Sequence, residues 1–219
     1  MGVRTSCIPR PEVLVGDLDD AIFAADFGDV IAGSAPKVYS DPKVFCQNTH
    51  PADPLRKIVR DVFTRLADPH EAGTLIRLST GFGGGKSHAL IALWHLAHHV
   101  TDLSYGTDLL PAASRPAAVK VLAVDANKAG TPIFATHREL QVRSLWGELA
   151  WQLGGETALR TLGAADDAEA QPDEGTFMRL LPQEPLLILI DELVFYMTTL
   201  SERAQGNLLA FLNKLTSIV

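Results

Sequence analysis

The residues best suited to chemistry lie between Thr80 and Ser87, in the order Thr-Gly-Phe-Gly-Gly-Gly-Lys-Ser. A polyphosphate is held by inward-pointing backbone N–H groups, a helix N-terminus, a cationic side chain and a hydroxyl that ligates magnesium. The glycines allow the backbone a close approach and positive φ angles. Lys86 would reach the β- and γ-phosphates, and Ser87 would ligate Mg²⁺. The segment therefore predicts a phosphate-binding loop.

This loop departs from the usual pattern at its start. Where the common pattern has its first glycine, this chain has Thr80, and the glycine follows one place later at Gly81. The end that faces the phosphates, Gly83 to Ser87, is complete. We expect the loop to turn differently at its beginning. The alternative is a glycine-rich strand-to-helix turn with an exposed lysine.

A second group of residues combines an apolar run, Leu186–Ile190, with the acidic pair Asp191 and Glu192. A buried strand that ends in this way at the carboxyl edge of a sheet is a Walker B pattern. It places Asp191 near the magnesium ion and Glu192 near the attacking water. A glutamate acting as general base favours hydrolysis over phosphoryl transfer to a second substrate. The alternative is a buried strand followed by an acid that caps a helix.

Hydrophobic periodicity predicts the elements that position these residues. Strands are expected at Thr74–Ser79, directly before the loop, at Val119–Val124, which Asp125 closes, and at Leu186–Ile190. Helices are expected at 55–66, at 88–99, from about His137 to Leu153 with Gly154 and Gly155 ending it, and from about Glu202. Apolar strands that alternate with helices predict a parallel α/β sheet covered on both faces.

The chain divides into two parts by composition. Residues 1–55 contain many prolines, so we expect an N-terminal extension with one short helix, capped by Asp17 and ended by Gly28 or Gly33, and an irregular segment that packs on the core. Residues 56–219 form the expected core. Within the core, the acidic stretch 164–175 is predicted to be a solvated loop.

Composition excludes several classes of protein. With 19 basic and 26 acidic residues the formal charge is −7, so there is no global basic field for nucleic acid. The longest apolar runs are far shorter than the roughly 20 residues of a membrane-spanning helix, and the start lacks a signal pattern. These features predict a cytoplasmic protein without membrane contact. Cys7 and Cys46 lack metal or disulfide spacing and are interpreted as reduced, structural thiols.

Three weaker candidates each have a simpler explanation. The second expected helix carries four histidines, His88, His95, His98 and His99. They could suggest a metal site, but histidines near a helix C-terminus are also explained by the favourable interaction of positive charge with the helix dipole. Tyr39, Phe45 and Thr49 could line an adenine pocket or pack in the core. Asp125 could contact a partner or the metal, or serve as a turn residue.

Five strings make the chain similar to the N-terminal part of AAA-type P-loop ATPases: Arg10–Leu14, Asp19–Asp26, Val38–Pro42, Phe82–His88 and Leu145–Leu149. They resemble more closely a family of large prokaryotic ATP-binding proteins without an assigned biochemical role, often encoded beside DNA methylases and helicases in anti-phage defence clusters. The resemblance covers nearly the whole chain. In that family a serine often precedes the phenylalanine where this chain has Gly81.

The resemblance implies a three-layer αβα P-loop NTPase fold with a mainly parallel sheet, and ATP and Mg²⁺ as cofactors. It implies catalytic roles for Lys86, Asp191 and Glu192, and metal ligation by Ser87 and Asp191. The residues expected to contact the nucleotide are Gly81, Phe82, Gly83, Gly84, Gly85, Lys86, Ser87 and His88. Hydrolysis would drive remodelling of a nucleic-acid or protein partner in anti-phage defence. A homo-oligomeric full-length form and DNA methylase, helicase or DNA partners are implied by the same resemblance.

The usual AAA-type core also has a sensor strand, an arginine finger and a helical lid after the Walker B strand. The sequence ends at Val219, in or just after the helix that follows, so we expect an N-terminal fragment in which the loop strand has an open edge. Such a fragment would bind ATP weakly and hydrolyse it slowly or not at all. Two other classes remain open: a nucleotide-dependent switch or scaffold without hydrolysis, and a small-molecule kinase.

Overall fold

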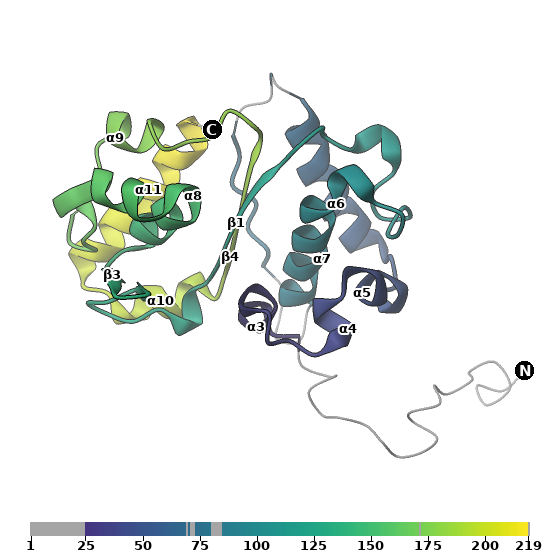
Figure 1. Cartoon of the computed structure of the whole chain (residues 1–219), viewed down its shortest axis with the longest axis horizontal. Coiled ribbons are helices and arrows are strands. Elements are labelled where there is room, and N and C mark those ends of the chain that lie inside the picture. Colours follow the sequence, from purple (N-terminus) through teal and green to yellow (C-terminus); the bar gives the residue numbers. More distant parts are fainter. Residues whose placement is uncertain (1–24, 69, 71–72, 80–84, 171, 219) are drawn as a thin grey trace, which may run out of the picture.

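Two layers of helices enclose a pair of parallel strands in the computed structural model (Figure 1). The structure describes residues 25–68, 70, 73–79, 85–170 and 172–218. Strands β1 (Lys120–Asp125) and β4 (Leu186–Asp191) pair in register from Lys120 opposite Leu186 to Asp125 opposite Asp191. The prediction of a mixed α/β fold with a parallel sheet is confirmed at this level.

The two strands send alternate side chains into two separate cores, as the pleat of a strand requires. Leu122 and Val124 enter the core formed with the later helices, whereas Ala123 faces the earlier ones. Leu187 and Leu189 of β4 also face the earlier helices. This burial on both faces explains why the strands are continuous apolar runs rather than alternating ones.

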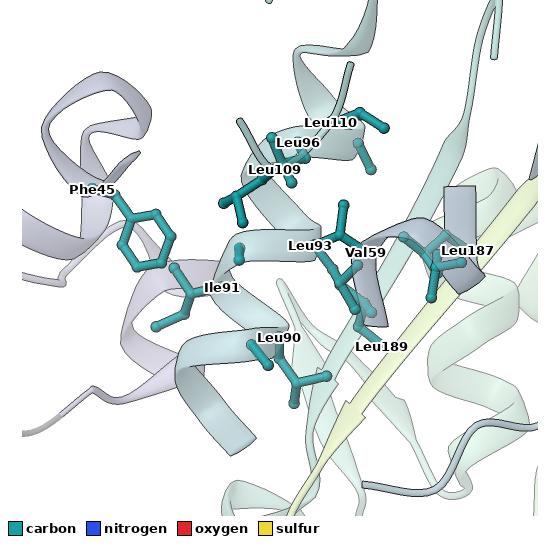
Figure 2. Close-up of a cluster of buried hydrophobic side chains, with 14 of the residues drawn as sticks. Phe45, Val59, Leu90, Ile91, Leu93, Leu96, Leu109, Leu110, Leu187 and Leu189 are labelled. Carbon is teal, nitrogen blue, oxygen red and sulfur yellow. The ribbon is translucent and has the colours of Figure 1, made fainter. Parts of the chain in front are cut away.

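The first core is built around α7 (Lys86–His98), which packs between α6 (Asp53–Ala67) and the sheet. Figure 2 shows Leu90 and Leu93 of α7 beside Val59 of α6 and Leu187 and Leu189 of β4. Short turns of 3-10 helix follow, η2 (Val100–Asp102) and η3 (Ala112–Ser114), with Leu109 and Leu110 buried between them. Both predicted helices are confirmed.

Three short helices precede α6: α3 (Phe27–Ala32), α4 (Lys37–Ser40) and α5 (Pro42–Asn48). Asp26 and Asp41 cap α3 and α5 by accepting bonds from backbone N–H groups of the first turn. Gly33 ends α3 in the left-handed conformation, as predicted for a helix end, whereas Gly28 lies inside α3. The expected cap Asp17 lies outside the described residues.

Helix α3 lies directly against the carboxyl end of β1. A Cβ atom at Gly28 would collide with Asp125 Oδ2, so only glycine permits this approach. Lys128 connects the same parts, because its Nζ lies 3.0 Å from Asp29 and 3.9 Å from Asp125. These contacts therefore hold α3 against the end of β1.

The second core contains the later elements. After η4 (Ala126–Lys128) come β2 (Ala135–His137), β3 (Leu140–Val142), α8 (Leu145–Leu162), η5 (Gly163–Ala165), α9 (Glu174–Met178), α10 (Leu193–Thr199) and α11 (Glu202–Ile218). The final helix is confirmed from Glu202, whereas α10 was not expected.

The predicted start of a helix at His137 is wrong. Residues 135–142 form an antiparallel hairpin, which turns through Arg138 at φ 58°, and α8 begins only after Ser144. The acidic stretch sets this boundary, because Asp166 accepts a 2.6 Å hydrogen bond from the Ser144 hydroxyl. Gly154 and Gly155 do interrupt the helix, as predicted, and a further helical segment continues to Leu162.

The predicted strand at Thr74–Ser79 is also wrong, because residues 73–79 have no regular secondary structure. A strand needs a neighbour for its backbone groups, and β1 and β4 pair only with each other among the described residues. The side chains of Leu75 and Ile76 are 64% and 41% exposed, and Leu78 packs against the first core. The pattern was that of a buried strand, but the described chain supplies no pairing partner.

The two edges of the sheet differ in their protection. On β1, the side-chain amide of Gln152 donates to the backbone oxygen of Ala123 and accepts from its N–H, at 2.8 and 2.9 Å. Gln152 also donates to the buried Glu148, which pairs with His137 at 2.6 Å. On β4, no described residue bonds to the outer edge.

No helix within the described part of the chain is long and apolar enough to cross a membrane.

Candidate functional site

Two predicted site residues, 104 positions apart in the sequence, meet at the carboxyl edge of the sheet. The Ser87 hydroxyl donates a 2.7 Å hydrogen bond to Asp191 Oδ2. Ser87 lies in the first turn of α7, and Asp191 is the last residue of β4. Asp191 is 8% exposed. A hydroxyl and a carboxylate oxygen are thus held together at the start of a helix.

The backbone before Ser87 is arranged for this position. Gly85 adopts φ 75°, a left-handed conformation that favours glycine, and its carbonyl accepts the first helical bond from Ala89. Lys86 is half-buried at the first position of α7. The predicted contacts Gly81, Phe82, Gly83 and Gly84 lie outside the described residues. The described end of the loop therefore places Lys86 and Ser87 at a helix N-terminus, where the helix dipole favours anions.

Glu192 follows Asp191 at the beginning of α10. Its φ is 51°, and its N–H donates a 3.0 Å bond to Asp191 Oδ1. Both oxygens of Asp191 thus have a partner, the Ser87 hydroxyl and the Glu192 backbone. The Glu192 residue itself is exposed. The backbone therefore turns sharply at Glu192, directly after the end of β4, and the residue is in contact with solvent.

Asp125 is the register partner of Asp191 at the same edge. Its side chain is 10% exposed and caps η4 by accepting a 3.0 Å bond from Asn127 N–H. Burial raises the pKa of the Asp125 carboxyl above its ordinary value. These contacts favour the interpretation of Asp125 as a turn residue, which also holds Lys128.

The side chain of His88 contacts α5. Its Nε2 lies 3.0 Å from Thr49 Oγ1, and its ring lies 4.7 Å from the ring of Phe45. Phe45 is 1% exposed, and Tyr39 is also buried in the first core, so both serve packing. Sequence reasoning missed the pairing of His88 with Thr49. The residues are 39 positions apart, and no local pattern marks such a contact.

The other histidines of α7 are bonded to backbone oxygens. His95 Nε2 donates to the Tyr39 carbonyl at 2.7 Å, and His98 Nδ1 donates to the Trp94 carbonyl at 2.9 Å. In the described part of the chain, no three His, Cys, Asp or Glu side chains are grouped as metal ligands. Cys46 is half-buried, and burial raises the pKa of its thiol to about 11.

Comparison with known proteins places the sequence of this chain in a family. The family model of the DUF499 N-terminal domain matches residues 1–219, which is the whole chain. The chain belongs to the DUF499 family. No curated protein and no solved structure matches it. The expected resemblance to a family without an assigned biochemical role is therefore confirmed.

The donor set of this DUF499 domain fits a hard divalent cation. Mg²⁺ prefers oxygen ligands and commonly takes one or two protein oxygens together with phosphate and water. Ser87 Oγ and Asp191 Oδ2, only 2.7 Å apart, supply such oxygens beside the N-terminus of α7. The arrangement can hold a cation and an anionic group next to each other. A magnesium–phosphate pair has this chemistry.

Proposed function

We propose that this DUF499 domain binds Mg²⁺ and ATP as an AAA-type P-loop module and hydrolyses ATP. The observation that carries the proposal is the hydrogen bond from Ser87 to Asp191. It joins the end of a glycine-rich loop to the end of an apolar strand, which are the two sequence patterns that predict nucleotide binding. A glycine-rich turn without function would not require an acidic partner at this position.

The residues of the chain take distinct roles in this proposal. The N–H groups at the start of α7 and the Lys86 ammonium bind the phosphates, while Ser87 and Asp191 hold the metal. Bound magnesium neutralises charge on the phosphate oxygens. Glu192, exposed and adjacent to Asp191, accepts a proton from the attacking water. The glutamate thereby makes hydrolysis the favoured reaction over transfer to a second substrate.

The finer fold proposal is that β1 and β4 belong to a larger P-loop sheet. Lys120 N–H donates to the Pro185 carbonyl, so the polar backbone groups of Leu187 and Leu189 face β1 and those of Ile188 and Ile190 face outward. β4 is apolar from Leu186 to Ile190, as an interior strand is. A further strand on this edge, with Thr74–Ser79 beyond it, would give the strand order that the family resemblance implies.

The resemblance also supports the wider biological proposal. The module would act within a homo-oligomeric full-length protein that remodels a nucleic-acid or protein partner in anti-phage defence, alongside DNA methylases or helicases. The net charge of −7 requires any DNA contact to be local rather than a property of the whole surface.

Nucleotide binding is tested by titrating a fluorescent ATP analogue with and without magnesium. Lys86→Ala removes the cation and should weaken binding roughly 10- to 100-fold, which is the loss of affinity expected when a charge-assisted hydrogen bond is removed. Lys57→Ala, which removes an exposed lysine of α6, is the matched control and should bind like the wild type. Equal affinity of the Lys86 variant and the wild type would refute the proposed phosphate site.

Hydrolysis is tested with Glu192→Gln, which keeps the size of the side chain but removes the base. ATP should remain bound while turnover falls roughly 100-fold or more. A non-hydrolysing switch would show no kinetic change, and a kinase would tolerate the substitution. The exposed Glu202→Gln at the start of α11 controls for loss of one negative charge.

A further inference from the structure

The hydrogen bond between His88 and Thr49 has a defined direction. The Thr49 hydroxyl donates its hydrogen to the Phe45 carbonyl at 2.8 Å, because a carbonyl can only accept. Thr49 Oγ1 must therefore accept from His88, whose Nε2 carries the hydrogen. His88 is thus held with its hydrogen on Nε2, directed at Thr49.

The same face of α7 is attached to the preceding helices at a second point. His95 lies seven residues, or about two helical turns, after His88 and donates to the Tyr39 carbonyl at 2.7 Å. The ring of Phe45 packs between the two histidines, 4.7 Å from His88 and 5.3 Å from His95. One stripe of α7 is therefore fixed against α4 and α5 by polar contacts and by an aromatic ring.

Consecutive residues of a helix point about 100° apart. Ser87 bonds to Asp191 of the sheet, and His88 bonds to Thr49, which directly follows α5, so the first turn of α7 is held from two directions. The packing of α7 in the core sets the rotation of the helix as a whole. The N–H groups of its first turn have no helical partners, so a single tether would leave this turn able to fray and twist locally. Two tethers set the rotation of this turn.

We propose that His88 is a positioning residue for the phosphate site. By bonding to Thr49 it fixes the rotation of the first turn of α7, which keeps the Ser87 hydroxyl directed toward the metal position beside Asp191. This inference rests on the proposed function and adds the residues that orient its metal ligand. It assigns α5 a role in magnesium-dependent binding without contact between Thr49 and the nucleotide.

The test compares Thr49→Val with Thr49→Ser. Valine removes the hydroxyl at nearly constant size, whereas serine keeps the acceptor. The affinity for magnesium and a fluorescent ATP analogue should fall about tenfold in the valine variant and stay near the wild-type value in the serine variant. Affinity for the analogue without magnesium should change little in either, because the effect acts through Ser87. A general loss of structure would lower both affinities.

A second variant keeps the test valid if the valine variant does not fold. His88→Leu removes the N–H donor from the other side of the hydrogen bond, and the affinity for magnesium and the analogue should again fall about tenfold. Nitrogen NMR of the His88 ring should show hydrogen on Nε2 in the wild type and in Thr49→Ser.

The outcomes separate this inference from the proposed function. If the wild type and Lys86→Ala bind alike, or neither binds, the nucleotide site and the role of His88 both fall. If Lys86→Ala weakens binding as expected but Thr49→Val binds like Thr49→Ser, only the positioning role is overturned. Equal losses in the valine and serine variants would also overturn it, since the hydroxyl would not be the cause.

Discussion

The two edges of the sheet satisfy their backbone groups in different ways. At β1, Gln152 of α8 bonds to both polar groups of Ala123 and replaces a neighbouring strand with one side-chain amide. At β4, the outward groups of Ile188 and Ile190 have no bonding partner among the described residues. The β1 edge is closed to a further strand at Ala123, because its backbone groups are already bonded. An apolar edge with unpaired backbone groups, such as that of β4, can accept another strand. The comparison indicates on which side the sheet can grow.

Removing the amide that blocks β1 should have the largest effect. Gln152→Leu keeps the size of the side chain but leaves both polar backbone groups of Ala123 without a partner. It also removes one of the two partners of the buried Glu148, which keeps its pairing with His137. The free energy of unfolding should fall by about 2 to 4 kcal/mol, measured by urea denaturation. The exposed Gln141→Leu in β3 is the control and should change it by less than about 0.5 kcal/mol. A loss as small in the Gln152 variant would mean that the amide does not serve as a strand substitute.

Amide hydrogen exchange should show a smaller difference between the edges. The outward N–H groups of Ile188 and Ile190 should exchange roughly tenfold faster than those of Leu187 and Leu189, a difference of about 1.4 kcal/mol in protection. Ala123, outward but bonded to Gln152, should exchange slowly in the wild type and fast in Gln152→Leu. Equal protection of Leu187 and Ile188 would show that another segment covers β4.

The same comparison explains how far sequence alone could predict the structure. The Ser87–Asp191 contact follows from two local patterns, because a helix start and a strand end meet at the carboxyl edge of a parallel sheet. The prediction of a strand at Thr74–Ser79 was wrong because a strand forms only beside a neighbouring strand, and the sequence of the segment itself does not reveal whether such a neighbour is present. The apolar pattern predicted burial, whereas Leu75 and Ile76 are exposed, because the pattern carries no information on what lies beside the segment.

The start of α8 could not be predicted for a similar reason. Leu140, Val142 and Leu145 fit a helical stripe that continues into Trp146. The boundary at Ser144 depends on Asp166, which is 22 positions away and lies in a stretch that composition predicts to be solvated. The contact of His88 with Thr49 is equally non-local. The approach of Ser87 to Asp191 was therefore predictable, while the partners that orient these elements came only with the fold.

Gly28 sets how closely α3 approaches the sheet. A single methyl group there would displace Asp125 or push α3 away, and with it the pairing of Asp29 with Lys128. Within the DUF499 family, the residue at this position is thus a marker that can be scored in any sequence. Where a family member has glycine here, we expect α3 to dock against the end of β1. Where it has a larger residue, we expect either a displaced side chain at the position of Asp125 or a wider spacing between the N-terminal helices and the edge that carries Asp191.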